Sequence, residues 1–119
     1  MPVVLLISSM TTSRVFEIRT YTAAPGKLEA LKQRFQLHTF GYFARHDMEV
    51  VAFFEPLEPN DTLVYILAFD DNESADRAWA AFTSDPDWLA DKASTETDGP
   101  LTVSIETRRY VATDLSPLR

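Results

Sequence analysis

The chain has 119 residues, which is enough for one domain with a substantial hydrophobic core, and it has no cysteine. The missing cysteines exclude disulfides, thiolate metal sites, iron–sulfur clusters and a cysteine nucleophile. Eighteen acidic residues against eleven basic ones give a formal net charge of −7, and no cluster of Lys and Arg offsets it. Such a chain repels the phosphate backbone, so we expect no nucleic-acid partner.

Residues 1–14 are predicted to be an N-terminal extension of a single domain that spans residues 15–119. The apolar stretch 3–7 is too short for a membrane-spanning helix and lacks the basic residues that precede a signal sequence. Three interpretations of it stay open: an extra edge strand, an arm exchanged in a dimer, or an upstream start with Met10 nearer the true beginning. No Arg-rich amphipathic leader is present, so we expect a cytoplasmic protein without a membrane partner.

Alternation in residues 15–21 predicts the first strand, with Phe16 and Ile18 on one face and Glu17, Arg19 and Tyr21 on the other. Residues 24–27 place Pro25 at a first helical position. A helix is then predicted to run to about residue 45. One of its faces carries apolar and aromatic residues at spacings of 3, 4, 3 and 4: Leu28, Leu31, Phe35, His38 and Tyr42.

The second half of the chain predicts two more strands, two helices and a last strand. Strands are expected over residues 49–55 and 63–69, and the latter is apolar at nearly every position, so we expect both its faces to be covered. A capping box from Asp70 to Glu73 predicts a helix that buries one face, and Asp85 with Pro86 predicts the next. The expected buried faces are Ala75, Ala78, Trp79 and Phe82 on the first helix and Trp88, Leu89 and Ala93 on the second. Residues 102–110 are predicted to form the final strand.

This order, β-α-β-β-α-β, is that of a ferredoxin-like α+β plait. Two helices can cover only one face of a four-stranded sheet, yet the strands carry apolar residues on both faces. We therefore expect a homodimer in which two sheets pack face to face as a dimeric α+β barrel.

Several motifs resemble the NIPSNAP family. They are residues 16–22 (FEIRTYT) followed by PGK at 25–27, then 63–69 (LVYILAF), 78–82 (AWAAF), 85–88 (DPDW) and 114–118 (DLSPL). The resemblance covers residues 15–118 and implies the dimeric α+β barrel fold, which cofactor-free monooxygenases, lactone isomerases and haem-handling enzymes share. It does not imply an activity. Asp47 departs from the glycine expected at the end of the first helix, so that corner is expected to differ.

His38 and Tyr42 are the candidate catalytic residues, one helical turn apart. The helical pattern points the His38 imidazole at the sheet, where it could act as an acid or base near neutral pH; the alternative is a core histidine held by one hydrogen bond. Helix length places His38 opposite residues 15–17, so no dyad with Tyr21 is expected. His38 and His46 lie about 80° apart around the helix, so no metal site is predicted, and no cofactor is predicted either.

Glu17, Arg19, Tyr21 and Trp79 are the candidate ligand-binding residues. If Phe16 and Ile18 face the helices, the first three line a polar pocket in the barrel, where Arg19 could bind an anionic or carbonyl ligand. The alternative is a buried ion-pair network that fixes dimer register. Trp79 could line an apolar pocket, or it could belong to the core.

Two functions remain open from the sequence. The first is a domain that binds or transforms a small apolar or carbonyl-bearing molecule in a cleft between helix and sheet, with a hollow at His38. The second is a non-catalytic homodimeric protein-interaction domain. Whether the chain is an enzyme is left undecided.

Overall fold

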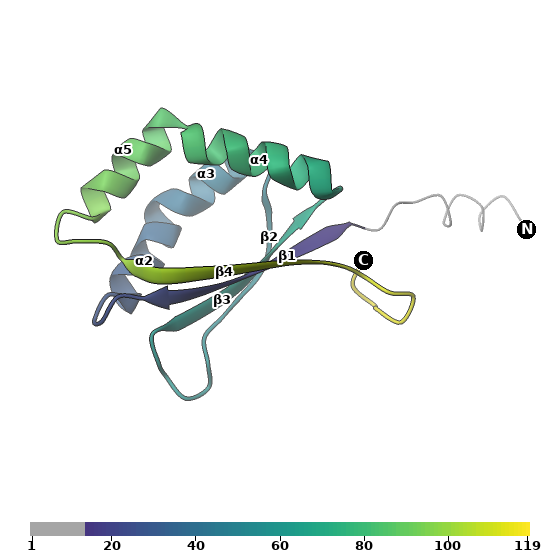
Figure 1. Ribbon diagram of the computed structural model, residues 1–119, viewed down its shortest axis with the longest axis horizontal. Helices are drawn as coiled ribbons and strands as arrows, with labels where there is room; N and C mark the ends of the chain where they lie inside the picture. The colour runs from purple at the N-terminus through teal and green to yellow at the C-terminus, as the bar shows by residue number, and fades with distance from the viewer. Residues whose placement is uncertain (1–13) are drawn as a thin grey trace, which may run out of the picture.

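A four-stranded antiparallel sheet in the order β2-β3-β1-β4 carries all the helices on one face (Figure 1). The structure is a computed structural model that describes residues 14–119; the predicted extension, apart from Arg14, and the stretch 3–7 lie outside the described residues. The elements are β1 (Val15–Ala23), α2 (Leu28–Arg34), the π-helix η1 (Phe35–Thr39), α3 (Phe40–Arg45), β2 (Glu49–Phe54), β3 (Thr62–Phe69), α4 (Asn72–Ser84), α5 (Pro86–Thr95) and β4 (Thr102–Val111). The predicted α+β plait is confirmed. Within residues 14–119, no helix is long and apolar enough to cross a membrane.

Pro25 lies in a turn before the first helix and not at its first position. The Lys27 N–H donates to the Ala24 carbonyl at 2.9 Å, and Gly26 has φ 76. Proline followed by a residue with positive φ is the pattern of a type II β-turn, which needs glycine at that place. The helix therefore begins at Leu28, three residues later than the proline suggested.

The predicted long helix is interrupted by the π-helix η1. The Phe40 N–H donates to the Phe35 carbonyl five residues back, and the Thr39 hydroxyl donates to the Arg34 carbonyl at 3.3 Å. The wider turn changes which side chains face the sheet, so that buried positions recur every four residues: Leu31, Phe35, Thr39 and Phe43. Thr39 thus occupies the place predicted for His38, which is half-buried and turned toward α5.

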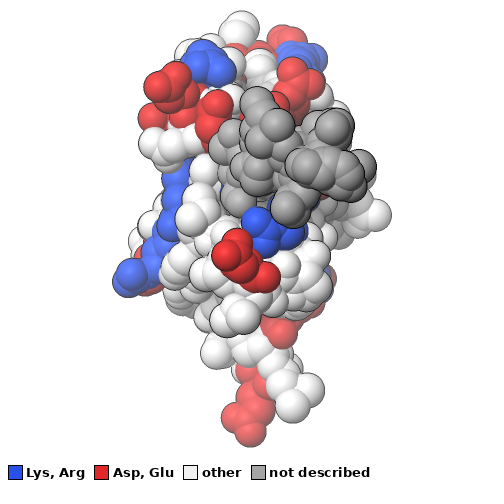
Figure 2. Space-filling view, turned by 90° about the vertical axis from the view of Figure 1, so that its right-hand side faces the viewer, with Lys and Arg blue, Asp and Glu red and all other residues white. Residues whose placement is uncertain are grey.

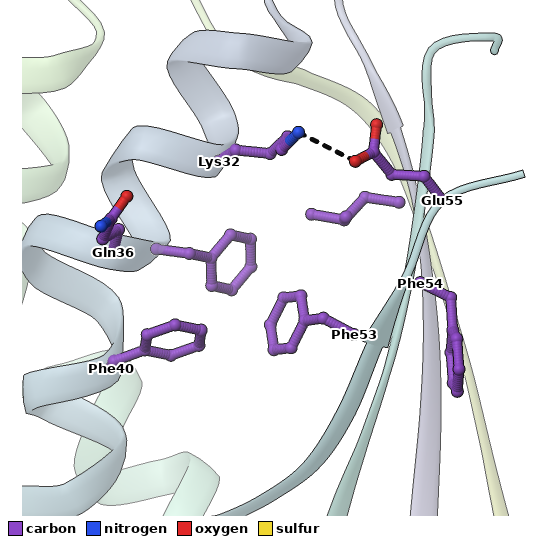
Figure 3. Close-up of a pocket in the computed structure, with 8 residues that line it drawn as sticks. Lys32, Gln36, Phe40, Phe53, Phe54 and Glu55 are labelled. Atoms are coloured by element: carbon purple, nitrogen blue, oxygen red, sulfur yellow. Dashed lines mark hydrogen bonds and ion pairs between the residues drawn. The ribbon is translucent and has the colours of Figure 1, made fainter.

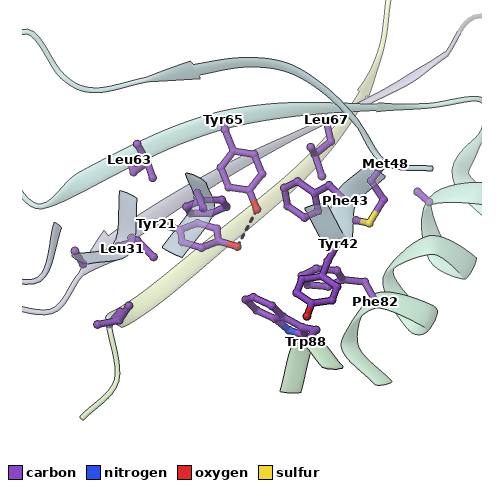
Figure 4. Close-up of a cluster of buried hydrophobic side chains, with 14 of the residues drawn as sticks. Tyr21, Leu31, Tyr42, Phe43, Met48, Leu63, Tyr65, Leu67, Phe82 and Trp88 are labelled. Atoms are coloured by element: carbon purple, nitrogen blue, oxygen red, sulfur yellow. Dashed lines mark hydrogen bonds between the residues drawn. The ribbon is translucent and has the colours of Figure 1, made fainter. Parts of the chain in front are cut away.

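The faces of β1 are opposite to those predicted. Glu17, Arg19 and Tyr21 pair with Leu67, Tyr65 and Leu63 of β3, and these residues lie under the helices (Figure 4). Phe16 and Ile18 therefore face the open side of the sheet. Alternation in the sequence separates the two faces of a strand but does not say which face the helices cover. The polar residues of this face can be buried because they form hydrogen bonds with one another. On β3, Val64 and Ile66 are half-buried on the open face, so the described part of the chain does not cover both faces of that strand.

The caps of α4 and α5 are aspartates, but the first is Asp71 and not Asp70. Its carboxylate accepts from the Ser74 N–H at 2.7 Å, while Asp85 accepts from the Asp87 N–H at 2.9 Å with Pro86 at the start of α5. The predicted buried face of α4 is confirmed. On α5 only Trp88 is buried, because this helix packs through Trp88, Asp91 and Thr95 and leaves Leu89 and Ala93 exposed.

Asp47 adopts the left-handed conformation that was expected to need glycine. Its φ is 57, and the Met48 N–H donates to the Phe43 carbonyl at 2.8 Å. This six-residue closure ends a helix in the same way as a glycine does. The corner therefore keeps the usual shape, with an aspartate held in a disfavoured conformation.

Candidate functional site

A cleft opens between the first helix and the β2–β3 side of the sheet. Its volume is about 330 Å³, within the range of small-molecule sites. Figure 3 shows Phe40 and Phe53 pointing toward each other across it, whereas Phe54 points away on the other side of its strand. We call it the aromatic cleft; it is lined by Lys32, Phe35, Gln36, Phe40, Phe53, Phe54, Glu55 and Leu63.

Two local irregularities of the backbone build the aromatic cleft. The π-helix η1 begins at Phe35 and ends one residue before Phe40, and the rings of these two residues are 6.1 Å apart. In β2, a bulge lies between Val50 and Ala52. Val50 and Phe53 are three positions apart and would face opposite sides of a regular strand. Because of the bulge, both pair with helix-facing residues of β3. Phe53 then lies 5.0 Å from Phe35 and 5.2 Å from Phe40, both edge-on.

The rim of the aromatic cleft is charged on one side. Lys32 donates to Glu55 at 2.8 Å and to Glu29 at 3.4 Å, and Gln36 is exposed one turn further along the helix. The hydrogen bond to Glu55 is the main reason that the pKa of Lys32 is raised above its usual value. Apolar rings thus form the floor, while hydrogen-bonding groups stand at one edge.

Behind the aromatic cleft, a polar cluster joins the sheet to α4. The Glu17 side chain is fully buried and accepts from Arg19 at 3.0 Å and from Arg109 at 2.8 Å. Arg109 also donates to Asp76 of α4 at 2.7 Å. One buried carboxylate is therefore neutralised by two cations, one of which has a second, exposed partner. We call these residues the Glu17 cluster: Glu17, Arg19, Tyr21, Tyr65, Trp79 and Arg109.

Arg19 is the centre of this cluster. It donates to the hydroxyls of Tyr65 at 2.8 Å and Tyr21 at 3.2 Å, and those hydroxyls lie 2.8 Å from each other (Figure 4). Its guanidinium stacks 4.0 Å from the Trp79 ring, whose N–H is buried without a partner among the described residues. Burial acts to lower the pKa of Arg19, but Tyr65, Tyr21 and Glu17 outweigh it and raise that pKa. Burial raises the pKa of Tyr65 well above its usual value, so both groups keep their protons at neutral pH.

The structure brings the four predicted ligand-binding residues together, but outside the aromatic cleft. Glu17, Arg19 and Tyr21 are hydrogen-bonded to one another and to side chains of β3 and β4, and the Trp79 N–H has no partner among the described residues. None of the four lines the cleft. Two tyrosines of the Glu17 cluster support the cleft from behind, since Phe53 stacks on Tyr65 at 4.5 Å and Phe35 lies 5.7 Å from Tyr21. Their predicted contact with a ligand stays a prediction.

His38 and Tyr42 meet at a third residue, Asp91 of α5. The Tyr42 hydroxyl donates to Asp91 at 2.5 Å, and His38 Nδ1 lies 3.4 Å from the same oxygen. The hydrogen bond to Asp91 raises the pKa of Tyr42 to about 12, which keeps it protonated at neutral pH. A hollow of about 200 Å³ lies beside His38, below the usual size of ligand sites, and Tyr42 does not line it.

A larger hollow of about 420 Å³ lies between the end of α3 and α4, but its walls are mainly polar. Arg45 and Arg77 stand there with Asp47 and Asp70, so its charges largely cancel. His46, at the same corner, lies 2.8 Å from Asp85. On the face shown in Figure 2, basic and acidic side chains are interspersed and form no continuous basic patch outside the grey atoms. Among residues 14–119, no three His, Asp or Glu side chains gather to hold a metal ion.

Comparison with known proteins identifies the family of this chain. The family model for NIPSNAP proteins matches residues 16–117. The chain belongs to the NIPSNAP family.

Solved structures of NIPSNAP proteins are similar over nearly the whole chain. One from Agrobacterium tumefaciens, described as a family member with unknown function, is 25% identical, with a TM-score of 0.77 over 90% of this chain and 95% of the other. An uncharacterised NIPSNAP-like domain protein from Burkholderia xenovorans is 19% identical, with a TM-score of 0.76 over 88% and 90%. SnoaB, a cofactor-independent oxygenase from Streptomyces nogalater, is 21% identical, with a TM-score of 0.58 over 89% and 99%, and shares the fold. Comparison with curated proteins gave no match.

Sequence reasoning missed the residues that line the cleft of this NIPSNAP domain. Phe53 and Phe54 were visible as part of an apolar strand, but the bulge that turns Phe53 toward the helices and Phe54 away from them has no signature in the sequence. Gln36 and Phe40 lie off the predicted helical face, and Phe40 comes directly after the π-helix. Asp91 is one of two acidic residues on α5, and only the packing of that helix brings it to Tyr42.

Proposed function

We propose that this NIPSNAP domain binds a small, largely apolar molecule in the aromatic cleft. The observation that carries the proposal is the cleft itself, a hollow of about 330 Å³ with rings of Phe35, Phe40 and Phe53 as its floor. Cavities of this size and lining are the usual form of small-molecule sites. Its floor rests on the Glu17 cluster, so the binding surface is formed before any ligand arrives.

A carbonyl group on the ligand fits the polar edge of the cleft. Lys32 Nζ and the Gln36 amide are donors at that edge, and an oxygen acceptor reaching them would keep the apolar part of the ligand over the rings. The proposal concerns binding and assigns no reaction. The likeness to a cofactor-independent oxygenase, at 21% identity, supports the fold alone.

The test is titration with acetylnaphthalene, a flat neutral ketone, followed by ligand-observed NMR. We expect saturable binding, weakened at least about fivefold in Phe40→Ala because one wall of the cleft loses its buried apolar area. The matched control is Leu37→Ala, which removes a large side chain from the same helix; Leu37 is 71% exposed and lines the hollow beside His38. Absence of saturable binding would overturn the proposal, as would binding that Leu37→Ala weakens and Phe40→Ala does not.

We further propose that two copies pair through the open face of the sheet, as a homodimer working in the cytoplasm. This face carries half-buried Ile18, Val64 and Ile66 with no helix of the described chain above them, and Phe54 and Tyr110 are about half exposed beside them. Apolar side chains gathered on one face of this kind mark an interface between proteins. The lack of cysteine is consistent with the reducing cytosol.

Sedimentation velocity tests the homodimer. We expect twice the chain mass for the native protein and a single-chain mass for Ile66→Lys, which puts a charge in the middle of the open face. Ala80→Lys adds the same side chain on the exposed side of α4 and should leave the dimer intact. A native protein that sediments as a single chain at its highest soluble concentration would refute the homodimer. A dimer that binds none of the tested small molecules would favour the alternative function, a non-catalytic interaction domain.

A further inference from the structure

We propose that the rim of the aromatic cleft selects an aromatic amine over an aromatic acid. The inference rests on the proposed function and names the class of ligand for that site: a flat ring joined to a protonated amine through one or two carbons. The juxtaposition that carries it is an apolar floor of three phenylalanine rings beside the Lys32–Glu55 ion pair. A second carboxylate, Glu29, pairs with Lys32 from outside the cleft lining.

The charge count of the rim decides its preference. Lys32 holds two acidic partners at once, Glu55 at 2.8 Å and Glu29 at 3.4 Å, so these three groups together carry one net negative charge. Among the described residues, Lys32 is the one hydrogen-bond partner found for Glu55, and it contacts a single carboxylate oxygen, Oε2. The other oxygen can accept from a ligand amine, whereas a ligand carboxylate would have to compete with Glu55 for Lys32.

The floor of the cleft favours the same sign of charge. The faces of aromatic rings attract cations. Phe53 meets Phe35 and Phe40 edge to face at 5.0 and 5.2 Å, and the rings of Phe35 and Phe40 are tilted to each other at 6.1 Å. A ring seated among them, with its amine directed to Glu55, satisfies both parts of the site. The whole chain adds to the effect, because its formal net charge is −7.

The expected preference is moderate because the rim is partly exposed. The side chains of Lys32 and Glu55 are 36% and 44% exposed, so solvent screens their charges. We expect naphthylethylamine to bind about fivefold more tightly than naphthylacetate at low salt, with neutral naphthylethanol between them. Raising the salt to about 0.5 M should bring the two charged compounds closer together.

Two rim variants should move the amine-to-acid ratio in opposite directions. Glu55→Gln makes the three rim groups neutral and should lower the ratio about threefold, whereas Lys32→Gln makes the rim more negative and should raise it. The control is Glu73→Gln, which makes the same change at an 87% exposed position on α4, away from the cleft. All three compounds are titrated by calorimetry into the native protein and each variant.

The outcomes separate the two proposals. Both proposals are supported if the alcohol binds, the amine binds more tightly than the acid, and the two rim variants shift the amine-to-acid ratio in opposite directions. If the alcohol binds but the acid binds as tightly as the amine, or if Glu55→Gln and Glu73→Gln change the ratio equally, the selection by charge is overturned while the binding site stands. If none of the three compounds binds saturably, both proposals fail.

Discussion

Removal of the buried charge of Glu17 is the most direct test of the forces that hold this domain together. Glu17→Gln keeps the shape of the side chain and one acceptor oxygen, but it leaves Arg19 beneath α4 without its counter-charge. Arg109 keeps Asp76 as an ion partner at 2.7 Å, so the loss falls on Arg19. Removing one partner of a buried ion pair costs about 3 to 5 kcal/mol, and because the amide still accepts one hydrogen bond we expect about 3 kcal/mol.

Denaturant unfolding followed by circular dichroism at one fixed protein concentration measures that loss. Concentration must be fixed because assembly of the protein adds to its apparent stability. The control is Glu106→Gln on β4, whose partner Arg108 is 67% exposed, and it should change the free energy of unfolding by less than about 0.5 kcal/mol. A Glu17→Gln variant within about 0.5 kcal/mol of the native protein would show that the Glu17 cluster carries little of the fold's stability and would refute this reasoning.

Two further predictions concern the corner where α3 ends and α5 begins. Asp47→Gly should raise the free energy of unfolding by about 0.5 to 1 kcal/mol, because glycine adopts φ 57 without strain, and equal or lower stability in urea melts would contradict this. Acid should destabilise the domain through Asp85. Hydrogen bonds from His46 and Arg45 lower the pKa of this carboxyl from 3.8 to about 2. The folded state therefore holds this carboxylate ionised where the unfolded chain takes up a proton, so stability falls as pH drops from about 4 to about 2. Melts across that range should show a shallower pH dependence in Asp85→Asn, which keeps the cap, and an unchanged slope would contradict the assignment.

The order and type of the elements could be predicted because each depends on local patterns. Alternation in β1, the aspartate and proline that start α5, and the apolar face of α4 are all written within a few neighbouring residues. The pairing of sheet and helices in a plait follows from that order alone. Boundaries agreed within a few residues for the same reason.

The features that place the site depend instead on distant parts of the chain. Glu17 is buried because Arg109, far along the sequence, comes beside it on β4. The polar face of β1 was therefore assigned to the wrong side, since a sequence pattern does not reveal that partner. His38 was placed against the sheet by assuming 3.6 residues per turn throughout, and a single wide turn at η1 rotated it toward Asp91.

The π-helix also ties the number of residues in the first helix to the aromatic cleft. The turn holds one residue more than a regular helix would, and everything after it is rotated accordingly. A relative that lacks one residue between Leu31 and Phe43, yet keeps both in its core, would have a regular helix and no means of placing rings as Phe35 and Phe40 are placed here. Counting the residues between these two core positions would thus divide NIPSNAP sequences into those that can form an aromatic cleft and those that cannot.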